Sequence, residues 1–260
     1  MAKFITDVFT EDEANVIALG VDCPESLREA SRLVEPFDMI EQRNFLKNTQ
    51  IFDAGDIKAA EVESKIKGVL EKGKVPLILA KEHSVTLDAM RAMPRETRLV
   101  VFDAHPDLKD EYEGSKSSHA CWLRRLCELI GCKGMAIVGV RSCEEEELEF
   151  MENNGMVYFT AKQVKDEPAK VLEVLRDFAS GFKIYVSLDM DVFDPSIAPA
   201  VKYPEPSGIM YDDFVKLVDA LREADIAGVD CIEIRPIESN RITEFLAVKS
   251  LFKLFGSLRL

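Results

Sequence analysis

Histidine is scarce in this chain of 260 residues, which contains only three, and tryptophan occurs once. Basic residues are also in deficit, because 33 Lys and Arg stand against 47 Asp and Glu and leave a formal charge of −14. This balance argues against a nucleic-acid-binding protein, which needs an excess of Lys and Arg to contact phosphate. An acidic pocket would favour a small cationic substrate, whereas a solvated acidic surface is the simpler interpretation of most of this charge.

Long hydrophobic runs are missing as well. No apolar stretch approaches the roughly 20 residues that a membrane helix needs. The N-terminal residues turn acidic at once and contain no apolar signal core, so we expect a cytoplasmic protein that does not contact a membrane. None of the six cysteines forms a C-x-x-C pair. We interpret all six as reduced, small apolar side chains rather than as zinc ligands.

Apolar runs with strand character alternate along the chain with amphipathic segments. The expected strands cover 16–20, 75–80, 99–102, 135–140, 156–160, 183–188 and 228–234. The expected helices cover 58–72, 85–93, 119–130, 144–153, 161–179, 211–224 and 242–255. Continuous apolar strands separated by helices are typical of an α/β fold whose parallel sheet is covered on both faces. Because no linker or repeat interrupts this pattern, we expect a single domain over residues 1–260.

All three histidines lie in one pattern of acidic and imidazole residues. The pattern consists of His83, Asp103, His105, Asp107, His119, Asp189 and Asp191. Four expected strands end at or just before His83, Asp103, Asp189 and Glu233. The carboxyl ends of parallel strands form one edge of a sheet, where ligands bind, so we expect these side chains to converge.

The two aspartate-rich segments have the spacing of metal ligands. Asp103, His105 and Asp107 would point to one side of an extended backbone, which Pro106 favours. Asp189 and Asp191 repeat this spacing. Either segment alone would also suit a turn or a helix cap. Together, carboxylates and imidazoles without thiolate suit manganese, and less well iron, cobalt or zinc. Two adjacent divalent ions make water nucleophilic at neutral pH.

Two nearby residues allow two interpretations each. His119 is either a residue of a helix start or a proton carrier at the mouth of the site. Glu233 either forms an ion pair with Arg235 or holds a planar cationic group such as a guanidinium. Trp122 is most simply an aromatic residue of the core.

These residues resemble the ureohydrolases, the family that includes arginase and agmatinase. The resemblance covers roughly residues 75 to 250, and its most specific markers are Asp103-Ala104-His105-Pro106-Asp107, the segment from Ser187 to Ala200, and Glu233-Ile234-Arg235-Pro236. It implies a three-layer α/β/α domain around a mostly parallel sheet of about eight strands. It further implies a site with two Mn²⁺ ions per chain that hydrolyses guanidino compounds to an amine and urea. Trimers or hexamers are common in this family.

The resemblance also implies a role for each site residue. One ion would be held by His83, Asp103, Asp107 and Asp189. The other ion would be held by Asp103, His105, Asp189 and Asp191, so that Asp103 and Asp189 bridge the pair. Asp107 would also orient the attacking water, Glu233 would hold the guanidinium, and His119 would pass a proton to the leaving amine.

The loop after Asp107 is similar to that of agmatinases, because Lys109, Asp110 and Glu111 replace the Asn/Thr/Ser-rich loop of arginases. An amine-ended substrate suits these acidic residues, so agmatine, cleaved to putrescine and urea, is the expected substrate. Arginine, guanidinobutyrate and aminopropylagmatine are alternatives. A deacetylase-like hydrolase with a single metal, or a non-enzymatic relative, is a weaker alternative.

The chain departs from the family pattern in three places. Lys81-Glu82 precedes the first histidine instead of Gly-Gly-Asp, and Val201-Lys202-Tyr203 follows Ala200 instead of Gly-Thr-Pro. The glycine-rich N-terminal loop is shortened to residues 24–28. These changes are expected to affect the walls of the pocket rather than the metal ligands.

Overall fold

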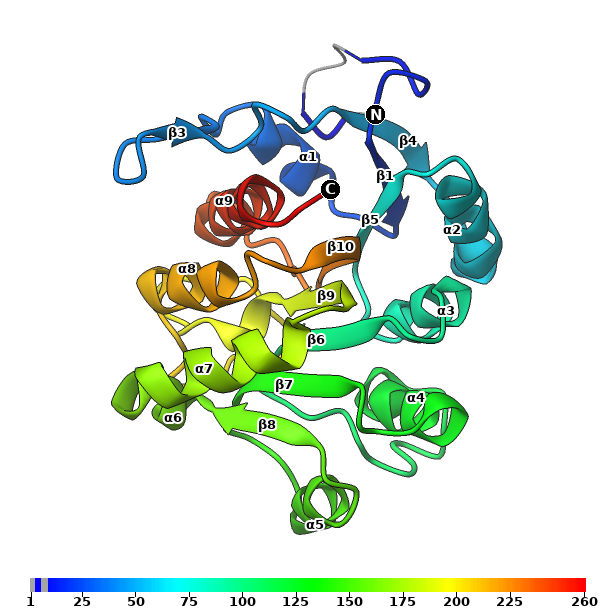
Figure 1. The fold of residues 1–260 in the computed structure, drawn as a ribbon, viewed down its shortest axis with the longest axis vertical. Helices are drawn as coiled ribbons and strands as arrows, with labels where there is room; N and C mark the ends of the chain where they lie inside the picture. Colours follow the sequence, from blue (N-terminus) through cyan, green and yellow to red (C-terminus); the bar gives the residue numbers. More distant parts are fainter. Residues whose placement is uncertain (1–2, 6–8) are drawn as a thin grey trace.

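The fold, described for residues 3–5 and 9–260 of a computed structural model, is a single α/β domain built on one eight-stranded sheet (Figure 1). Its strands are β1 (Val16–Val21), β4 (Ile51–Asp56), β5 (Val75–Ala80), β6 (Arg98–Phe102), β7 (Met135–Val140), β8 (Val157–Thr160), β9 (Lys183–Asp189) and β10 (Asp225–Ile232). All neighbouring strands pair in parallel. The expectation of a parallel sheet is therefore confirmed.

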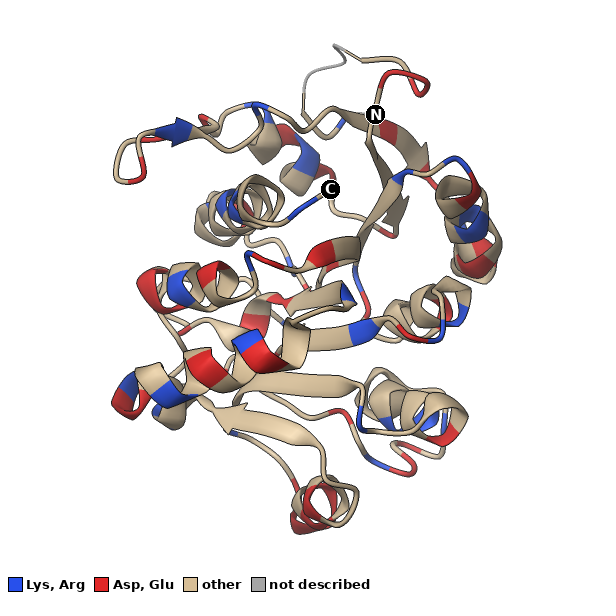
Figure 2. Cartoon of the chain, in the orientation of Figure 1, with Lys and Arg blue, Asp and Glu red and all other residues tan. Residues whose placement is uncertain are grey.

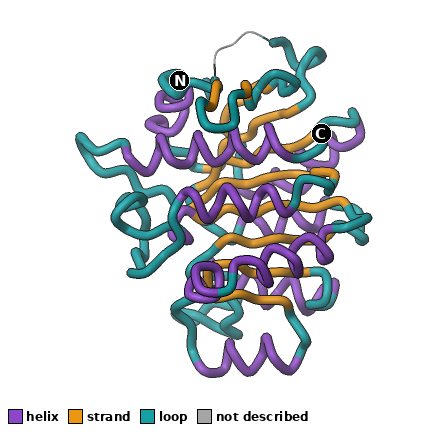
Figure 3. The backbone as a smooth tube through the Cα atoms, turned by 60° about the vertical axis from the view of Figure 1, so that its left-hand side comes forward, coloured by secondary structure: helices purple, strands orange, loops and turns teal. Residues whose placement is uncertain are grey.

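Helices cover both faces of the sheet. One face carries α1 (Glu25–Ser31), α6 (Ala161–Asp166), α7 (Pro168–Ala179), α8 (Tyr211–Ala220) and α9 (Ile242–Ser257). The other carries α2 (Val62–Glu71), α3 (Val85–Ala92), α4 (Trp122–Ile130) and α5 (Glu145–Asn153). The strands lie between the two helical layers in the turned view of Figure 3.

Each strand contributes to two separate hydrophobic cores. In β5, Leu77 and Leu79 pack with the first helical layer, whereas Ile78 and Ala80 pack with the second. This division follows from the alternation of side chains along a strand. The charged residues therefore lie mostly on helices and loops, as Figure 2 shows.

The strand order places four chemically important strand ends side by side. The order across the sheet is β4-β1-β5-β10-β9-β6-β7-β8. The chain passes from β5 across the sheet to β6, and β9 and β10 later fill the space between these two strands. The residues that follow β5, β6 and β9, together with Glu233 after β10, therefore meet at one edge.

Two elements at the N-terminal end were not expected. β4 and α1 are joined by Arg28, whose guanidinium contacts Asp53 at 2.8 Å and Asp56 at 2.7 Å. Because α1 begins at Glu25, residues 24–28 lie largely in a helix, and the expectation that they form a short loop is wrong. Asp53 and Asp56 give the edge strand β4 a polar sequence, which hides it from an analysis based on apolar runs.

The expected helix over 161–179 is also two helices. Glu167 ends α6, and Pro168 begins α7 at a position where a missing N–H costs nothing. A small hairpin, β2 (Phe37–Asp38) with β3 (Arg43–Asn44), extends from the domain beside α1 (Figure 1). Over the described residues, no helix combines the length and apolar character that a membrane crossing requires.

Candidate metal centre and substrate pocket

A cavity of about 350 Å³ opens at the carboxyl edge of the central strands. Its walls include every site residue named from the sequence, which are His83, Asp103, His105, Asp107, His119, Asp189, Asp191 and Glu233. The convergence expected from the strand ends is therefore found.

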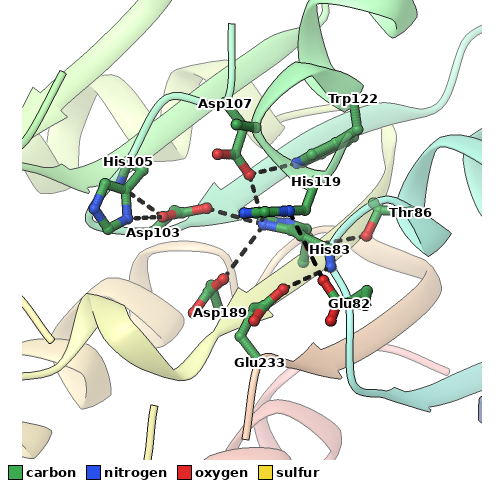
Figure 4. A network of polar contacts seen from close by, with 12 residues as sticks. Glu82, His83, Thr86, Asp103, His105, Asp107, His119, Trp122, Asp189 and Glu233 are labelled. Carbon is green, nitrogen blue, oxygen red and sulfur yellow. Dashed lines mark hydrogen bonds and ion pairs between the residues drawn. The ribbon is translucent and has the colours of Figure 1, made fainter. Parts of the chain in front are cut away.

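The deeper part of the cavity is built around His83. The Nδ1 atom of His83 lies 3.0 Å from Asp103 Oδ2, 3.1 Å from Asp107 Oδ2 and 3.4 Å from Asp189 Oδ2 (Figure 4). His83 is only 1% exposed. Three carboxylates from two different strand ends and one loop thus face a single imidazole nitrogen.

The outer part of the cavity is built around His105. Its Nδ1 lies 2.9 Å from Asp191 Oδ2 and 3.7 Å from Asp103 Oδ1. Two groups of potential ligand atoms result, His83 with Asp103 and Asp189, and Asp103 with His105 and Asp191, each within 4.8 Å. Asp103 belongs to both groups, so they are two halves of one centre.

The backbone of residues 103–107 does not have the conformation that the sequence predicted. The segment after β6 bends at Ala104 and His105, and Asp107 has a φ of 52°. The fully extended geometry expected for this segment is therefore wrong, although its three polar side chains do line one cavity. Glu233 has a φ of 63°. Non-glycine residues in this left-handed region are strained and are typical of functional sites.

The electrostatics of the centre favour a bound cation. Burial, with Asp191 and Asp107 nearby, raises the pKa of Asp103 to about 6. Burial and neighbouring carboxylates also raise the pKa of Asp189 well above its ordinary value. For His83 burial opposes protonation, but the surrounding carboxylates outweigh it and raise the pKa. Crowded, buried carboxylates of this kind are stabilised by bound cations.

Two buried atoms at the centre of the site also lack hydrogen bonds. Neither His83 Nδ1 nor Asp103 Oδ2 makes a well-formed hydrogen bond within the described part of the chain, although they face each other at 3.0 Å. An imidazole nitrogen and carboxylate oxygens are suitable ligands for a divalent metal. The residues present therefore fit a metal centre.

Glu233 forms the ion pair with Arg235 that was considered for it, and it also lines the cavity. It lines the cavity, and its Oε2 lies 2.9 Å from Arg235 Nη2 while Oε1 accepts a hydrogen bond of 3.0 Å from the His83 backbone N–H. Burial raises the pKa of Glu233 to about 7, and the charge of Arg235 opposes this rise. The carboxylate is thus held in place by the chain before any ligand binds.

His119 also lines the cavity, in a short 3-10 turn before α4, where the Ser118 hydroxyl accepts a hydrogen bond from the Ala120 N–H. Its ring stacks on Tyr203 with centroids 5.9 Å apart. Burial and the charge of Lys202 lower the pKa of His119. The imidazole is therefore mostly neutral at pH 7.

Two departures from the family pattern meet beside His119. Glu82 Oε1 lies 2.8 Å from Arg235, and its Oε2 lies 3.8 Å from both Lys202 Nζ and His119 Nδ1. Segments more than 100 residues apart in sequence therefore form one cluster of charged residues, of which Lys202 and His119 line the cavity. The expectation that these changes affect the walls agrees with this geometry.

Three residues near the site have positions or contacts that the sequence did not predict. Trp122 is a buried core residue, as interpreted, but its indole N–H also donates to Asp107 Oδ2 at 2.8 Å. Cys143 is exposed and lines the cavity, so the interpretation of all six cysteines as apolar core residues is wrong for this one. Asp110 pairs with Lys116 and Arg125 outside the cavity.

Comparisons with known proteins place this geometry in a wider group. Residues 19–256 match the sequence model of the arginase family. An agmatinase of Bacillus subtilis is 34% identical over 228 residues, covering 82% of this chain and 77% of that protein. An N(1)-aminopropylagmatine ureohydrolase of Synechocystis is 32% identical over 208 residues, covering 78% of this chain and 67% of that protein. The crystal structure of agmatine ureohydrolase of Thermoplasma volcanium has a TM-score of 0.87 at 31% identity, covering 99% of this chain and 94% of that chain.

Proposed function

The chain belongs to the arginase family, and on this premise we propose that it is a ureohydrolase that cleaves agmatine to putrescine and urea. The observation that supports this best is the single cavity in which two halves of a metal centre, Glu233 and His119 face one another. A guanidino group held by the carboxylate would lie next to the metal centre, which is the arrangement that hydrolysis of its C–N bond needs.

The proposed cofactor is a pair of Mn²⁺ ions. One would be held by His83, Asp103, Asp107 and Asp189, and the other by Asp103, His105, Asp189 and Asp191, in keeping with the distances among these side chains. Oxygen ligands with some imidazole suit Mn²⁺. When bound, two adjacent divalent ions make water nucleophilic at neutral pH. Asp107, already fixed by Trp122, would orient that water.

Glu233 is proposed to bind the substrate guanidinium. A planar guanidinium forms two parallel hydrogen bonds with a carboxylate. Arg235 presents such a group to Glu233 Oε2 in the free protein. The substrate therefore has to share or displace this contact, and the strained backbone of Glu233 keeps the carboxylate directed into the cavity.

His119 is proposed to pass a proton to the leaving amine. A mostly neutral imidazole takes up a proton and releases it again during one catalytic cycle. The stacked Tyr203 fixes the plane of the ring, and the partly exposed Glu82 lies 3.8 Å from its Nδ1.

The choice of agmatine depends mainly on the relatives, which include agmatinases. The acidic residues of the loop after Asp107 do not support agmatine as the substrate, because Asp110 and Glu111 do not line the cavity. Glu144 and Glu205 do line it and could attract an amine tail. Arginine, guanidinobutyrate and aminopropylagmatine therefore belong in the same test.

The test is urea release by protein purified with Mn²⁺ and offered each of these guanidino compounds. We expect metal-dependent turnover with the highest kcat/KM for agmatine. Replacing Glu233 by Gln should lower kcat/KM by roughly 30-fold or more, since breaking a buried charge pair costs about 2–5 kcal/mol. The matched control is Glu111→Gln, which removes a carboxylate outside the cavity. Protein that binds two ions but releases urea from none of the compounds would refute the proposal.

We further propose that the chain works in the cytoplasm as a homo-oligomer, a trimer or hexamer. Met39 and Ile40, in the hairpin of β2 and β3, are 75% and 91% exposed, and exposed apolar side chains of this size are typical of contact surfaces. Light scattering on the purified protein tests the oligomeric state, and a monomer at micromolar concentration would contradict it.

A further inference from the structure

The mouth of the substrate cavity carries charges that the proposed reaction does not use. Exposure separates the mouth from the floor, because Glu233 is 5% exposed, whereas the side chains of Lys202 and Glu205 are 31% and 34% exposed. All three residues line the cavity. A guanidino compound held by Glu233 would therefore direct the other end of its chain, the tail, toward the mouth.

The lysine and glutamate residues that line the cavity differ in how far their charge is already neutralised. Lys109 forms an ion pair with Glu144. Glu147 is buried and accepts two hydrogen bonds from backbone N–H groups. Over the described residues, neither Lys202 nor Glu205 makes an ion pair shorter than 3.8 Å. The charges of these last two residues therefore remain available to a ligand.

Lys202 lies on the His119 side of the mouth. Its Nζ atom lies 3.8 Å from Glu82 Oε2, which lies equally far from His119 Nδ1. The other carboxylate oxygen of Glu82 contacts Arg235, and Arg235 contacts Glu233. A short series of ion pairs thus connects Lys202 with the carboxylate proposed to bind the guanidinium. A tail that leaves Glu233 past His119 comes near the Lys202 ammonium.

Tyr203 helps to keep this ammonium at the mouth. Lys202 Nζ lies 5.1 Å from the centre of the Tyr203 ring, within the range of a cation–π contact. The same ring stacks on His119. Both residues belong to the segment after Ala200 that departs from the family pattern. The positive charge at this position is therefore a feature of this chain rather than of the family motif.

We propose that Lys202 is a specificity-determining residue whose ammonium discriminates among guanidino substrates by the charge of their tail. It repels a tail that ends in an amine and attracts one that ends in a carboxylate, since charges interact over about 8 Å at physiological ionic strength. The inference rests on the proposed function. It means that Lys202 limits the preference for an amine tail that Glu205 would give.

Two other roles for Lys202 predict different results. If the ammonium only kept the pKa of His119 low, its loss would change kcat alike for every substrate. If it only paired with Glu82, its loss would have a small effect on stability and none that depends on the tail. Only a direct interaction with the tail changes the ratio of kcat/KM between substrates of opposite tail charge.

The experiment compares wild-type protein with Lys202→Met, which keeps a long side chain but removes its charge. The Mn²⁺-loaded proteins are offered agmatine, guanidinobutyrate and butylguanidine, whose tails are positive, negative and uncharged. Urea release gives kcat/KM for each compound, and isothermal titration calorimetry gives its affinity. We expect kcat/KM to rise about 2–5-fold for agmatine and to fall about 2–5-fold for guanidinobutyrate, as for a partly exposed charge pair. Butylguanidine should change least.

Two further variants serve as controls. Lys202→Arg keeps the charge and should keep the wild-type ratio of kcat/KM for the two charged compounds. Lys116→Met removes the same charge outside the cavity, where Lys116 pairs with Asp110, and should keep this ratio as well. Circular dichroism establishes that each variant is folded, and Lys202→Gln takes the place of Lys202→Met if the latter does not fold.

An unchanged ratio in the uncharged Lys202 variant would overturn the inference. So would an equal change for all three compounds, or an equal shift of the ratio in Lys116→Met. If no compound is cleaved, the proposed function fails, but calorimetry still tests Lys202. A shift of the affinity ratio toward agmatine then supports its role, whereas an unchanged ratio, or no binding of any compound, overturns it.

Discussion

The two halves of the metal centre differ in how the fold holds them. His83, in the deeper half, is 1% exposed and is supported from behind by Ser187 in the sheet. The side chain of His105, in the outer half, is 24% exposed, and its Nε2 faces Glu205 on a surface loop at 3.8 Å. Asp103 connects the halves. The deeper half is therefore fixed by core strands and the outer half by loops.

The guanidinium of one arginine, Arg141, connects those loops. Arg141, just after β7, donates to the backbone carbonyls of Asp191 at 2.7 Å, Glu205 at 2.8 Å and Val192 at 3.2 Å. Burial lowers its pKa, while nearby carboxylates oppose this effect. The comparison shows that one centre uses two methods of positioning, hydrogen bonds within the sheet and a guanidinium that joins loop carbonyls. Substitutions in the two halves should therefore have different effects on metal binding.

The largest effect is expected from the residue that both halves share. Asp103→Ala should abolish tight binding of both ions and lower kcat/KM by about 10³-fold, because metal ions supply several kcal/mol of transition-state stabilisation. Ion counting by inductively coupled plasma mass spectrometry and a urea assay measure the two effects. A variant that retains one tightly bound ion would show that the halves are independent.

The next effect tests the difference between the halves directly. His83→Asn should lower the affinity for the ion of the deeper half by more than about 10²-fold. His105→Asn should lower the affinity for the ion of the outer half by only about 10-fold, because water can replace a ligand only in the outer half. Competition with a chelator measures each affinity. Equal losses in the two variants would mean that burial does not distinguish the halves.

A smaller effect is expected at Trp122, which supports the deeper half through Asp107. Trp122→Phe keeps an aromatic ring in the core but removes the N–H that donates to Asp107 Oδ2. A hydrogen bond to a charged group contributes about 1.5–3 kcal/mol, so we expect roughly 10-fold weaker Mn²⁺ binding. Wild-type Mn²⁺ affinity in this variant would remove Asp107 from the ligand set. Leu129→Phe, a change at an exposed position of the same helix, is the control.

The smallest effect concerns the stability of metal-free protein. The folded-state pKa values of Asp103, about 6, and Glu233, about 7, lie above the ordinary values of 3.8 and 4.5. Raised values mean that this stabilisation is fully present below the ordinary values and is lost as pH rises through 6 and 7. Metal-free protein should therefore melt at a lower temperature at pH 8 than at pH 5, by about 2–4 °C for each kcal/mol.

Differential scanning calorimetry in the presence of a chelator measures this difference. Asp103→Asn, which cannot ionise, should show a weaker pH dependence, and added Mn²⁺ should restore stability at pH 8. If the metal-free protein and the Asp103→Asn variant respond equally to pH, the surface charge rather than the site controls its stability.

The fold was predictable from the sequence where neighbouring residues carry the information, as in a run of apolar residues. The seven apolar strands were found within a few residues, because buried parallel strands are continuous apolar runs. β4 was missed because Asp53 and Asp56 interrupt its apolar pattern. These two aspartates are stabilised in the strand by Arg28, which belongs to α1. Local composition cannot report a partner 25 residues away.

For the site, the sequence by itself determined which groups could hold a metal, since spacing and strand ends are local properties of the chain. Only the tertiary structure decided what fixes those groups: Ser187 lies 104 positions from His83, and Glu233 lies 150 positions from it. It also decided that Asp110 lies outside the cavity, whereas Lys202 lines it and contacts Glu82. The physical reason is that hydrogen bonds and ion pairs depend on distance in space, which the order of the strands sets.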